Sequence, residues 1–368
     1  MCSCSDTAPG ETPPIDPPTP TPTVTITKPE FVFGFQGQSK YSYCPSALKQ
    51  ADGTVHLYFC GNPENLIMVD NIFHIKINPD GTQTAAKSVL QPGVPGSWDD
   101  HHTCDPSVIE GNFTWKNTTY KYAMFFLSNM YGVYYNEIGV AFSNDLDTDS
   151  WVKYPQQIVK KTWSSEGDQE IGGSGKSWGV GQPSVVSLDG KGKLLLTYTV
   201  GDIGGTRIVW TEADFSNMDT YSISTPQTIV QTGLKAIDNQ SRDYTCNSEF
   251  AIDKDADKIV MIRPVQPMPN DYPNYLNSSL EIDYMNLSDF TNQRGNWTPI
   301  YRITPDDTGY PRNHNATLLR DNFGHLQDWE EPEFYFTVSK AAPDVQPSGS
   351  SHAEWTYHIW KSKVVKSK

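Results

Sequence analysis

The sequence predicts an all-β fold, a five-bladed β-propeller built from four-stranded antiparallel blades. Two observations predict it. Short alternating or apolar runs bounded by Gly, Asn, Asp and Pro dominate the 368 residues, and almost no sustained apolar pattern has helical spacing. One strand–turn–strand unit, followed by a third strand, also recurs five times along the chain. Such repeated antiparallel units are typical of propeller blades. A β-sandwich with coincidental internal similarity is the alternative.

The opening strands carry the clearest repeat. In chain order the five copies begin SYCPSALK, TCDPSVIE, GVGQPSVV, TCNSEFAID and RNHNATLL. A turn rich in Asp, Gly and Asn and an apolar return strand follow each opening. The third strands are IFHIKIN, NEIGVAFS, TRIVWTEA, LEIDYMN and TYHIWKS. After several of these, an Asp/Asn-rich turn leads to a hydrophobic or Trp-bearing fourth strand, as in NDLDTDSWVKY.

The first strand of each blade should line the central axis, with side chains alternating along it. The equivalent opening positions are therefore expected to meet in a ring: Cys44, Asp105, Gln182, Asn247 and His314. Two positions deeper lie Ser46, Ser107, Ser184, Glu249 and Ala316. Because a buried carboxylate is costly without a partner, Glu249 implies a cation, an arginine or a hydrogen-bond network beside it.

Charge and composition narrow the classes of partner. The formal net charge is −15, and the only basic cluster is the few lysines at the C-terminal end. Nucleic acid is therefore not an expected partner, since phosphate binding needs a basic surface. The 10 Trp and 19 Tyr suit stacking on sugar rings, although strand and core packing explains most of them. No apolar run is long enough to span a membrane.

The chain divides into a linker, residues 1–30, and a propeller domain, residues 31–368. The first segment is rich in Pro and Thr and should be disordered. Its cysteines near the start look like those of a mature bacterial lipoprotein, with lipid on the first cysteine. We expect a monomeric cell-surface or periplasmic protein that meets the membrane only through that anchor. A tail with incidental cysteines, or a secreted glycoprotein with seven Asn-x-Ser/Thr sequons, is the alternative.

Two further cysteines flank the first hairpin. Cys44 and Cys60 are placed symmetrically about Ala51-Asp52-Gly53, so they could face each other across antiparallel strands. A disulfide between them is one option, and the pairing is left open.

The opening DPSVI of blade two, the stretch IGVAFSNDLDTDSW behind it and a His opening the last blade resemble glycoside hydrolase family 43 and its furanosidase relatives. The resemblance implies inverting hydrolysis of arabinosyl or xylosyl bonds. It also implies three carboxylates that open consecutive blades: a base Asp, a pKa-tuning Asp and an acid Glu. Asp105 then matches the tuning Asp, and His314 matches an axial His that helps to hold calcium or water. Cys44 and Gln182 occupy the base and acid positions, where neither residue suits the role.

Replacement carboxylates must therefore come from elsewhere. The candidate catalytic residues are Asp105, Glu137, Glu249 and Asp100. The candidate substrate-binding residues are Trp98, His101, His102, Gln182, Arg207, Arg242 and Asn247. For each loop residue a solvated charge is the alternative, and Asp105 could also cap the turn before Pro106. No cofactor is expected to be required, although Asp105, Glu249 and His314 could surround a structural calcium ion.

The leading hypothesis is a glycoside hydrolase that acts on plant or algal polysaccharide fragments by carboxylate acid/base catalysis in the central funnel. A catalytically inactive carbohydrate-binding propeller is the alternative, and Cys44 and Gln182 favour it.

Overall fold

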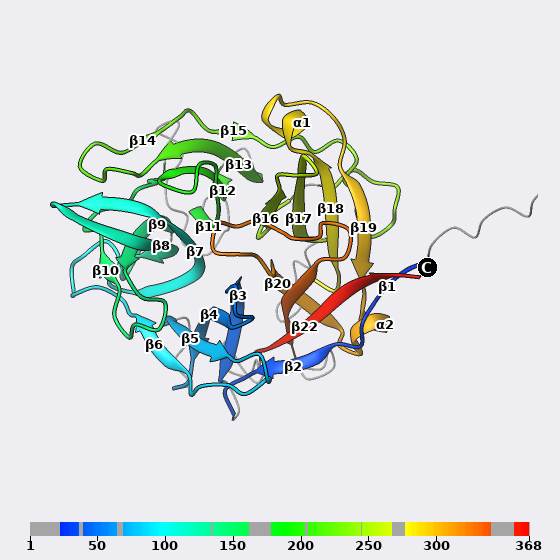
Figure 1. The fold of residues 1–368 in the computed structure, drawn as a ribbon, viewed down its shortest axis with the longest axis horizontal. Coiled ribbons are helices and arrows are strands. Elements are labelled where there is room, and N and C mark those ends of the chain that lie inside the picture. Colours follow the sequence, from blue (N-terminus) through cyan, green and yellow to red (C-terminus); the bar gives the residue numbers. More distant parts are fainter. Residues whose placement is uncertain are drawn as a thin grey trace, which may run out of the picture.

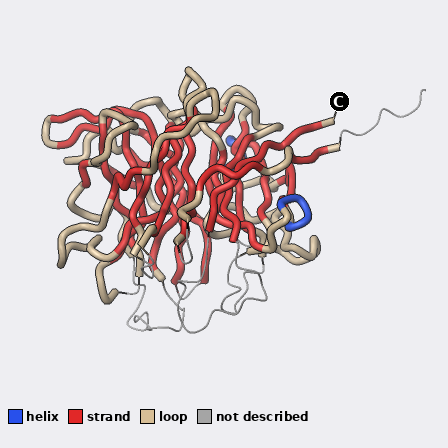
Figure 2. The backbone as a smooth tube through the Cα atoms, turned by 90° about the horizontal axis from the view of Figure 1, so that it is seen from below, coloured by secondary structure: helices blue, strands red, loops and turns tan. Residues whose placement is uncertain are grey.

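The structure is a computed structural model. It describes residues 23–36, 40–64, 69–133, 135–161, 178–202, 205–243, 245–266, 277–339 and 357–367. Five separate antiparallel sheets stand in a ring, with one strand of each sheet next to the centre (Figure 1). In the perpendicular view the strands run between the two faces of the ring (Figure 2). The predicted five-bladed, four-stranded propeller is confirmed.

Each of the first four blades is a meander of consecutive strands, numbered outward from the axis. Blade 1 consists of β3 (Tyr41–Lys49), β4 (Val55–Asn62), β5 (Asn71–Ile77) and β6 (Lys87–Leu90). Blade 2 consists of β7 (His102–Trp115), β8 (Thr118–Asn129), β9 (Glu137–Ser143) and β10 (Val152–Lys153). Blade 3 consists of β11 (Gly179–Ser187), β12 (Lys193–Asp202), β13 (Gly205–Asp214), β14 (Ser222–Ile223) and β15 (Gln227–Thr228). Blade 4 consists of β16 (Glu249–Asp253), β17 (Lys258–Pro264), β18 (Leu280–Asn286) and β19 (Thr298–Ile303).

Blade 5 is closed by both ends of the described chain. Its inner strands are β20 (Arg312–Leu318), β21 (Glu333–Ser339) and β22 (Tyr357–Lys366). The N-terminal strands β1 (Val24–Ile26) and β2 (Glu30–Phe33) pair antiparallel with the outer side of β22. The propeller therefore begins before the expected boundary at residue 31, because β1 already forms part of a blade. The rest of the expected linker, residues 1–22, lies outside the described residues.

The hydrophobic core lies mainly between neighbouring blades. Alternate apolar side chains of one sheet pack against those of the next, as Phe125 of blade 2 does with Val185 and Phe215 of blade 3. Two short helices, α1 (Leu287–Thr291) and α2 (Pro305–Thr308), lie next to the ends of blade 4 strands. In the described part of the chain, no helix has the length and hydrophobicity needed to cross a bilayer.

The connection between β20 and β21 closes one end of the axis. Its backbone carbonyls at 320, 322, 323 and 324 accept N–H groups from Lys49, Glu110, Ser187 and Ile252, one in each of blades 1 to 4. We call residues 320–326 the plug. Since the plug bonds to the innermost strand of every other blade, it fixes the five strands around a common axis.

Candidate functional site

The five opening positions do form a ring. Each innermost strand, or in blade 4 the segment just before it, carries a residue at positive φ, close to the left-handed helical region. In blades 1, 2, 3 and 5 a β-bulge surrounds this residue. These residues are Cys44 (48°), Asp105 (48°), Gln182 (47°), Asn247 (48°) and Asn315 (37°). A bulge reorients side chains locally and inserts an extra residue. The fifth member is thus Asn315, and the prediction of His314 in the ring is wrong by one residue.

All five ring residues line one small cavity of about 40 Å³ on the axis. Pro45, Pro106, Pro183, Ser248, Glu249 and Ala316 complete its lining. A volume of this size accommodates water or a single ion. A sugar ring is larger, so it would have to bind above the ring.

One layer deeper, the side chains hold the blades together. Ser107 and Ser184 accept N–H groups of the next blade, from Val185 at 3.2 Å and Phe250 at 3.0 Å. Glu249 takes the same role one blade further on, accepting the Leu318 N–H at 2.7 Å. The bulge places Thr317, rather than the expected Ala316, at this level in blade 5.

Glu249 has the arginine partner that its burial implies. The plug residue Arg320 is buried, lies 2.8 Å from the Glu249 carboxylate and donates to two backbone carbonyls of blades 3 and 4. Thr317 Oγ1 also donates to this carboxylate. Burial raises the pKa of Glu249, and the Arg320 charge opposes that rise. These contacts give Glu249 a structural role at the plug end.

The three residues suggested for calcium have other partners in the structure. Glu249 faces Arg320, and His314 Nδ1 lies 2.6 Å from Asn315 Oδ1. Over the described ranges, Asp105, Glu249 and His314 do not come together as one group of ligand atoms. A guanidinium already supplies the positive charge at this depth.

Asp105 is the carboxyl group at the centre of the ring. It is buried, and the Cys44 thiol and the Gln182 backbone N–H donate to its side chain. Burial raises the pKa of Asp105, while these two donors and the nearby His102 act in the opposite direction. Burial therefore favours the protonated form of this carboxyl group.

A second buried carboxylate lies beside the strands that carry the ring, and the sequence analysis did not identify it. Asp70 precedes β5 and is 1% exposed. The hydroxyls of Tyr41 and Tyr43 donate to its two oxygens at 2.7 and 2.6 Å, and the Thr103 N–H donates to its backbone carbonyl. Tyr41 and Tyr43 are two residues apart in the strand that carries Cys44, so their side chains lie on the same face of that strand. This spacing was the signal in the sequence for the two tyrosines. Asp70 itself stands in a stretch without a motif.

Two histidines at this level have nitrogens free for a ligand. His314 is buried, and its Nε2 has no hydrogen-bond partner among the described residues. Burial lowers the pKa of His314 to about 4, so its imidazole is neutral. Both ring nitrogens of His102 are shielded and likewise lack a partner in the described structure. The Oε1 atom of Gln182 is a third such group.

The loop before blade 2 does not bring all its predicted residues to the axis. Asp100 accepts the backbone N–H groups of Gly96 and Tyr131, both at 2.6 Å, which lowers its pKa and keeps it ionised. His101 packs against the Tyr131 ring. Trp98 stacks on Phe126 of blade 2. Asp100 therefore organises the loop, and none of these residues lines the axial cavity.

Three more predicted residues lie away from the ring. Glu137, at the start of β9, accepts from Gln157 Nε2 at 2.6 Å. Arg207 makes a bidentate ion pair with Asp202, with distances of 2.8 and 2.7 Å, at a cleft between blades 2 and 3. Arg242 is exposed, before the opening of blade 4. None of the three lines the axial cavity.

The cysteines pair differently from the option raised above. Cys60 of β4 and Cys104 of β7 form a disulfide that joins blades 1 and 2. Cys44 is a free, buried thiol. The bulge at Cys44 breaks the simple cross-strand register, so that Tyr43, and not Cys44, is opposite Cys60.

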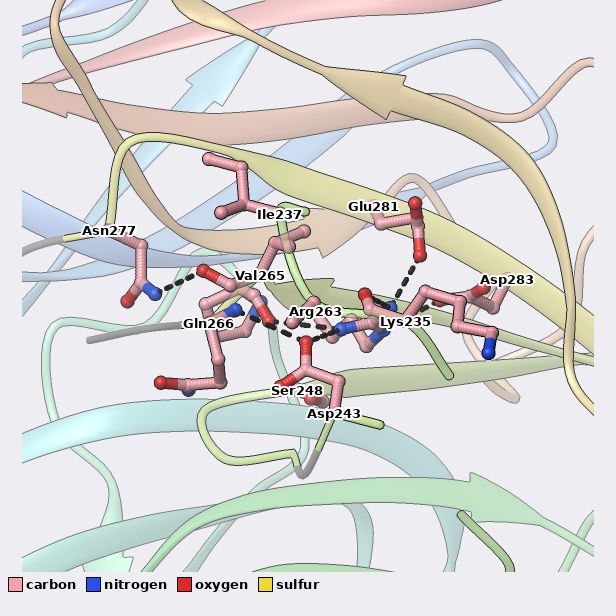
Figure 3. A network of polar contacts seen from close by, with 12 residues as sticks. Lys235, Ile237, Asp243, Ser248, Arg263, Val265, Gln266, Asn277, Glu281 and Asp283 are labelled. Carbon is pink, nitrogen blue, oxygen red and sulfur yellow. Dashed lines mark hydrogen bonds and ion pairs between the residues drawn. The ribbon is translucent and has the colours of Figure 1, made fainter. Parts of the chain in front are cut away.

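A buried ionic network supports the entry to blade 4. Figure 3 shows Arg263 among the side chains of Asp243, Glu281 and Asp283. Arg302 makes a further ion pair with Glu281 at 2.6 Å. Asp243 comes four residues before Asn247, so the network fixes the segment that leads into the ring strand.

At the level of sequence, no family model and no curated protein matches the chain. Solved structures do match it. A family 117 glycoside hydrolase from the marine bacterium Zobellia galactanivorans aligns with a TM-score of 0.57 and 10% identity, over 93% of this chain and 90% of that one. An α-L-arabinofuranosidase from Lactobacillus brevis gives 0.56 and 9%, over 88% and 90%. One from Podospora anserina, in complex with cellotriose, gives 0.51 and 11%, over 91% and 95%. At such low identity these likenesses show the fold alone.

Proposed function

We propose that the chain is a glycoside hydrolase that acts on plant or algal polysaccharide fragments, with Asp105 at the centre of its active site. The observation that carries the proposal is the buried Asp105 carboxyl at an axial ring whose neighbours include unpaired polar atoms of His102, His314 and Gln182. Such a combination is typical of polar ligand pockets. The solved structures cited above, which are glycoside hydrolases of similar fold, support the same class.

Asp105 would act as the general acid. Glycoside hydrolysis needs one carboxyl group that delivers a proton to the departing oxygen and one group that assists water. Burial raises the pKa of Asp105, which favours the protonated form required of an acid. Asp100, Glu137 and Glu249 have the backbone, glutamine and arginine partners described above, which suit structural roles.

A carbohydrate-binding propeller without catalysis is the second candidate. The observation that favours it is the absence of a carboxylate from two ring positions, Cys44 and Gln182, in the innermost strands of blades 1 and 3. Such a protein would keep the polar ring and the tyrosines around Asp70 for binding.

The test is a comparison of the unaltered chain with Asp105→Asn on a panel of aryl glycosides and plant and algal oligosaccharides. We expect turnover by the chain and a loss of about 10²-fold or more in the variant. Asp100→Asn is the matched control, because it removes a carboxylate nearby, and its rate should stay within a few-fold. Binding without turnover across the panel would favour the second candidate.

We further propose that the protein works outside the cytoplasm, at the cell surface or in the periplasm. The Cys60–Cys104 disulfide supports this, since structural disulfides persist in oxidising compartments. The lipid anchor, the monomeric state and the absence of a required cofactor stay predictions. Labelling with a radioactive fatty acid, compared between the chain and a Cys2→Ser variant in a bacterial host, would test the anchor.

A further inference from the structure

His102 is the first residue of β7 and lies three positions before Asp105. Its side chain is 14% exposed, and both of its ring nitrogens are shielded from solvent without a hydrogen-bond partner among the described residues. Buried imidazole nitrogens of this kind ordinarily find a partner within the protein. His102 does not line the axial cavity, but it lies close enough to Asp105 for its charge to act on that carboxyl group, so its open imidazole is available to a ligand or a water molecule.

Asp70 is placed to control the orientation of this imidazole. Its Oδ2 atom lies 3.8 Å from His102 Nδ1, about 1 Å longer than a hydrogen bond. The same carboxylate is fixed by the Tyr41 and Tyr43 hydroxyls, and its backbone carbonyl accepts the N–H of Thr103, next to His102. Contacts of this kind are often long in the free enzyme and shorten when substrate binds.

The groups around His102 determine which charges face its imidazole. The ionisable groups near the His102–Asp70 pair are Tyr41, Tyr43, Cys44, Asp105 and His101. Burial raises the pKa values of Tyr43 and Cys44, so both stay protonated and uncharged at neutral pH. The Asp70 side chain, with Oδ2 3.8 Å from His102 Nδ1, is placed to stabilise an imidazolium formed during a reaction.

We propose that His102 is the general base that activates water, that Asp70 is the residue that positions it, and that Asp105 is the acid of the same reaction. This inference rests on the proposed glycosidase function. With Nδ1–H directed at Asp70, the Nε2 atom of His102 takes one proton from water as the water oxygen bonds to the anomeric carbon. Asp105 gives its proton to the departing glycosidic oxygen. Transfer of the proton from His102 to Asp105, through solvent, restores both groups.

This assignment accounts for the missing base carboxylate. Cys44 occupies the corresponding ring position and donates its thiol hydrogen to Asp105. A thiol in that place cannot act as a carboxylate base, whereas an imidazole from the next blade, held by a carboxylate of blade 1, can accept the proton.

The first experiment reads the tautomer of His102 without any substrate, by ¹⁵N NMR of the imidazole in the full chain above pH 7. We expect the Nδ1–H tautomer, with an unprotonated Nε2, and a shift toward the other tautomer in Asp70→Asn. A dominant Nε2–H tautomer in the unaltered chain would overturn the role of Asp70, because the lone pair would then face away from the substrate.

The second experiment measures kcat and KM on the best substrate of the panel. We expect His102→Gln to lower kcat by about 10²- to 10⁴-fold with KM within a few-fold, and added imidazole to restore part of the rate of His102→Ala. Asp70→Asn should lower kcat by about tenfold, with its melting temperature recorded to confirm folding. His325→Gln, in the plug at the other end of the axis, is the matched control and should leave the rate unchanged.

The outcomes separate the two proposals. A chain that turns over substrate while His102→Gln keeps its rate and pH profile overturns the role of His102 and leaves the glycosidase function standing. A chain without turnover on the whole panel overturns both. Loss of rate in His102→Gln together with rescue of His102→Ala by imidazole supports a proton-transfer role, because a merely structural defect would not respond to added base.

Discussion

The two ends of the central axis contrast in how their polar groups are satisfied. At the plug end, Arg320, Glu249 and Thr317 bond to one another and to the backbone of neighbouring blades. At the other end, which we call the rim, His102 and His314 keep nitrogens without partners in the described structure. Both ends are shielded, so exposure alone does not distinguish them. The difference is that the plug end pairs its buried charges, with one guanidinium nitrogen, Arg320 Nε, left without a hydrogen-bond partner in the described residues, whereas the rim leaves two imidazoles open.

This contrast separates structural from functional carboxylates in the same ring of strands. Glu249 and Asp105 both belong to innermost strands, both are buried, and burial raises the pKa of each. Glu249 has a full counter-charge from Arg320. Among the described residues, Asp105 has a thiol and a backbone N–H as donors and no paired cation, so its proton can be exchanged at lower cost. The partner of each carboxylate, rather than its burial, thus indicates its role.

Arg320→Met is the strongest test of the plug end. Removal of the guanidinium leaves the Glu249 carboxylate buried without a counter-charge, so we expect the free energy of unfolding to fall by about 3–5 kcal/mol. Urea denaturation of the purified chain measures it. The double variant Arg320→Met, Glu249→Gln is the control and should recover part of the loss, because no buried charge remains. A cost below about 1 kcal/mol for Arg320→Met would contradict the structural role of this end.

The residues at these two ends of the axis could be predicted from the sequence where the five copies of the opening strand follow the same pattern. The repeat of opening strands places Cys44, Asp105, Gln182 and Asn247 correctly, because in each copy Pro or Ser follows the ring residue and the buried layer begins one position later. The fifth copy contains His314 and Asn315 side by side, and only the bulge register decides between them. Ala316 was expected one layer deeper, where Thr317 lies. Thr317 carries a hydroxyl, as do Ser107 and Ser184 at the equivalent position of blades 2 and 3. That shared hydroxyl was the signal in the sequence for the correct residue.

The residues that sequence reasoning missed act through contacts between distant segments. Asp70, Arg320 and the Cys60–Cys104 pair belong to no motif, and their roles arise where one blade meets another or where the plug crosses the axis. Glu249 is the exception, since the cost of burying its charge predicted a partner without identifying it. The fold was predictable because it repeats, whereas these contacts occur once.

The disulfide tests whether the rim needs a covalent link between blades 1 and 2. Cys104→Ala with Cys60→Ala should lower the free energy of unfolding by about 2–4 kcal/mol, because the bond closes a loop across a sequence separation of 44 residues. Thermal or urea denaturation measures it. Cys246→Ala, which removes a buried free thiol, is the control for loss of sulfur volume. A disulfide between Cys44 and Cys60, found by peptide mapping, would contradict the pairing.

The network around Arg263 is intermediate between the plug end, where the buried carboxylate has its own arginine, and the rim, where Asp105 has none. Here three carboxylates share two arginines. Burial, with the charge of Glu281, raises the pKa of Asp283 to about 7 in the folded chain. The folded state therefore holds a proton that the unfolded state releases near pH 4, so stability should fall as pH rises from about 4 to about 7. Relative to Asp283→Asn, we expect a loss on the order of 1–4 kcal/mol over this range. Urea titrations at several pH values measure it, and a difference independent of pH would contradict it.

Substitution of Arg207 should have the smallest effect on stability and activity. It shows how an ion-paired charge at the surface differs from the polar groups at the two ends of the axis. Its guanidinium is bound by both oxygens of Asp202, and both side chains are partly exposed, at 30% and 22%. Solvent screens such a pair, so Arg207→Gln should change the free energy of unfolding by less than about 1 kcal/mol. Because Asp202 already occupies the guanidinium, the variant should also leave KM within about twofold. A rise in KM of tenfold or more would instead show that substrate displaces Asp202, and would extend the site from the axis to the cleft between blades 2 and 3.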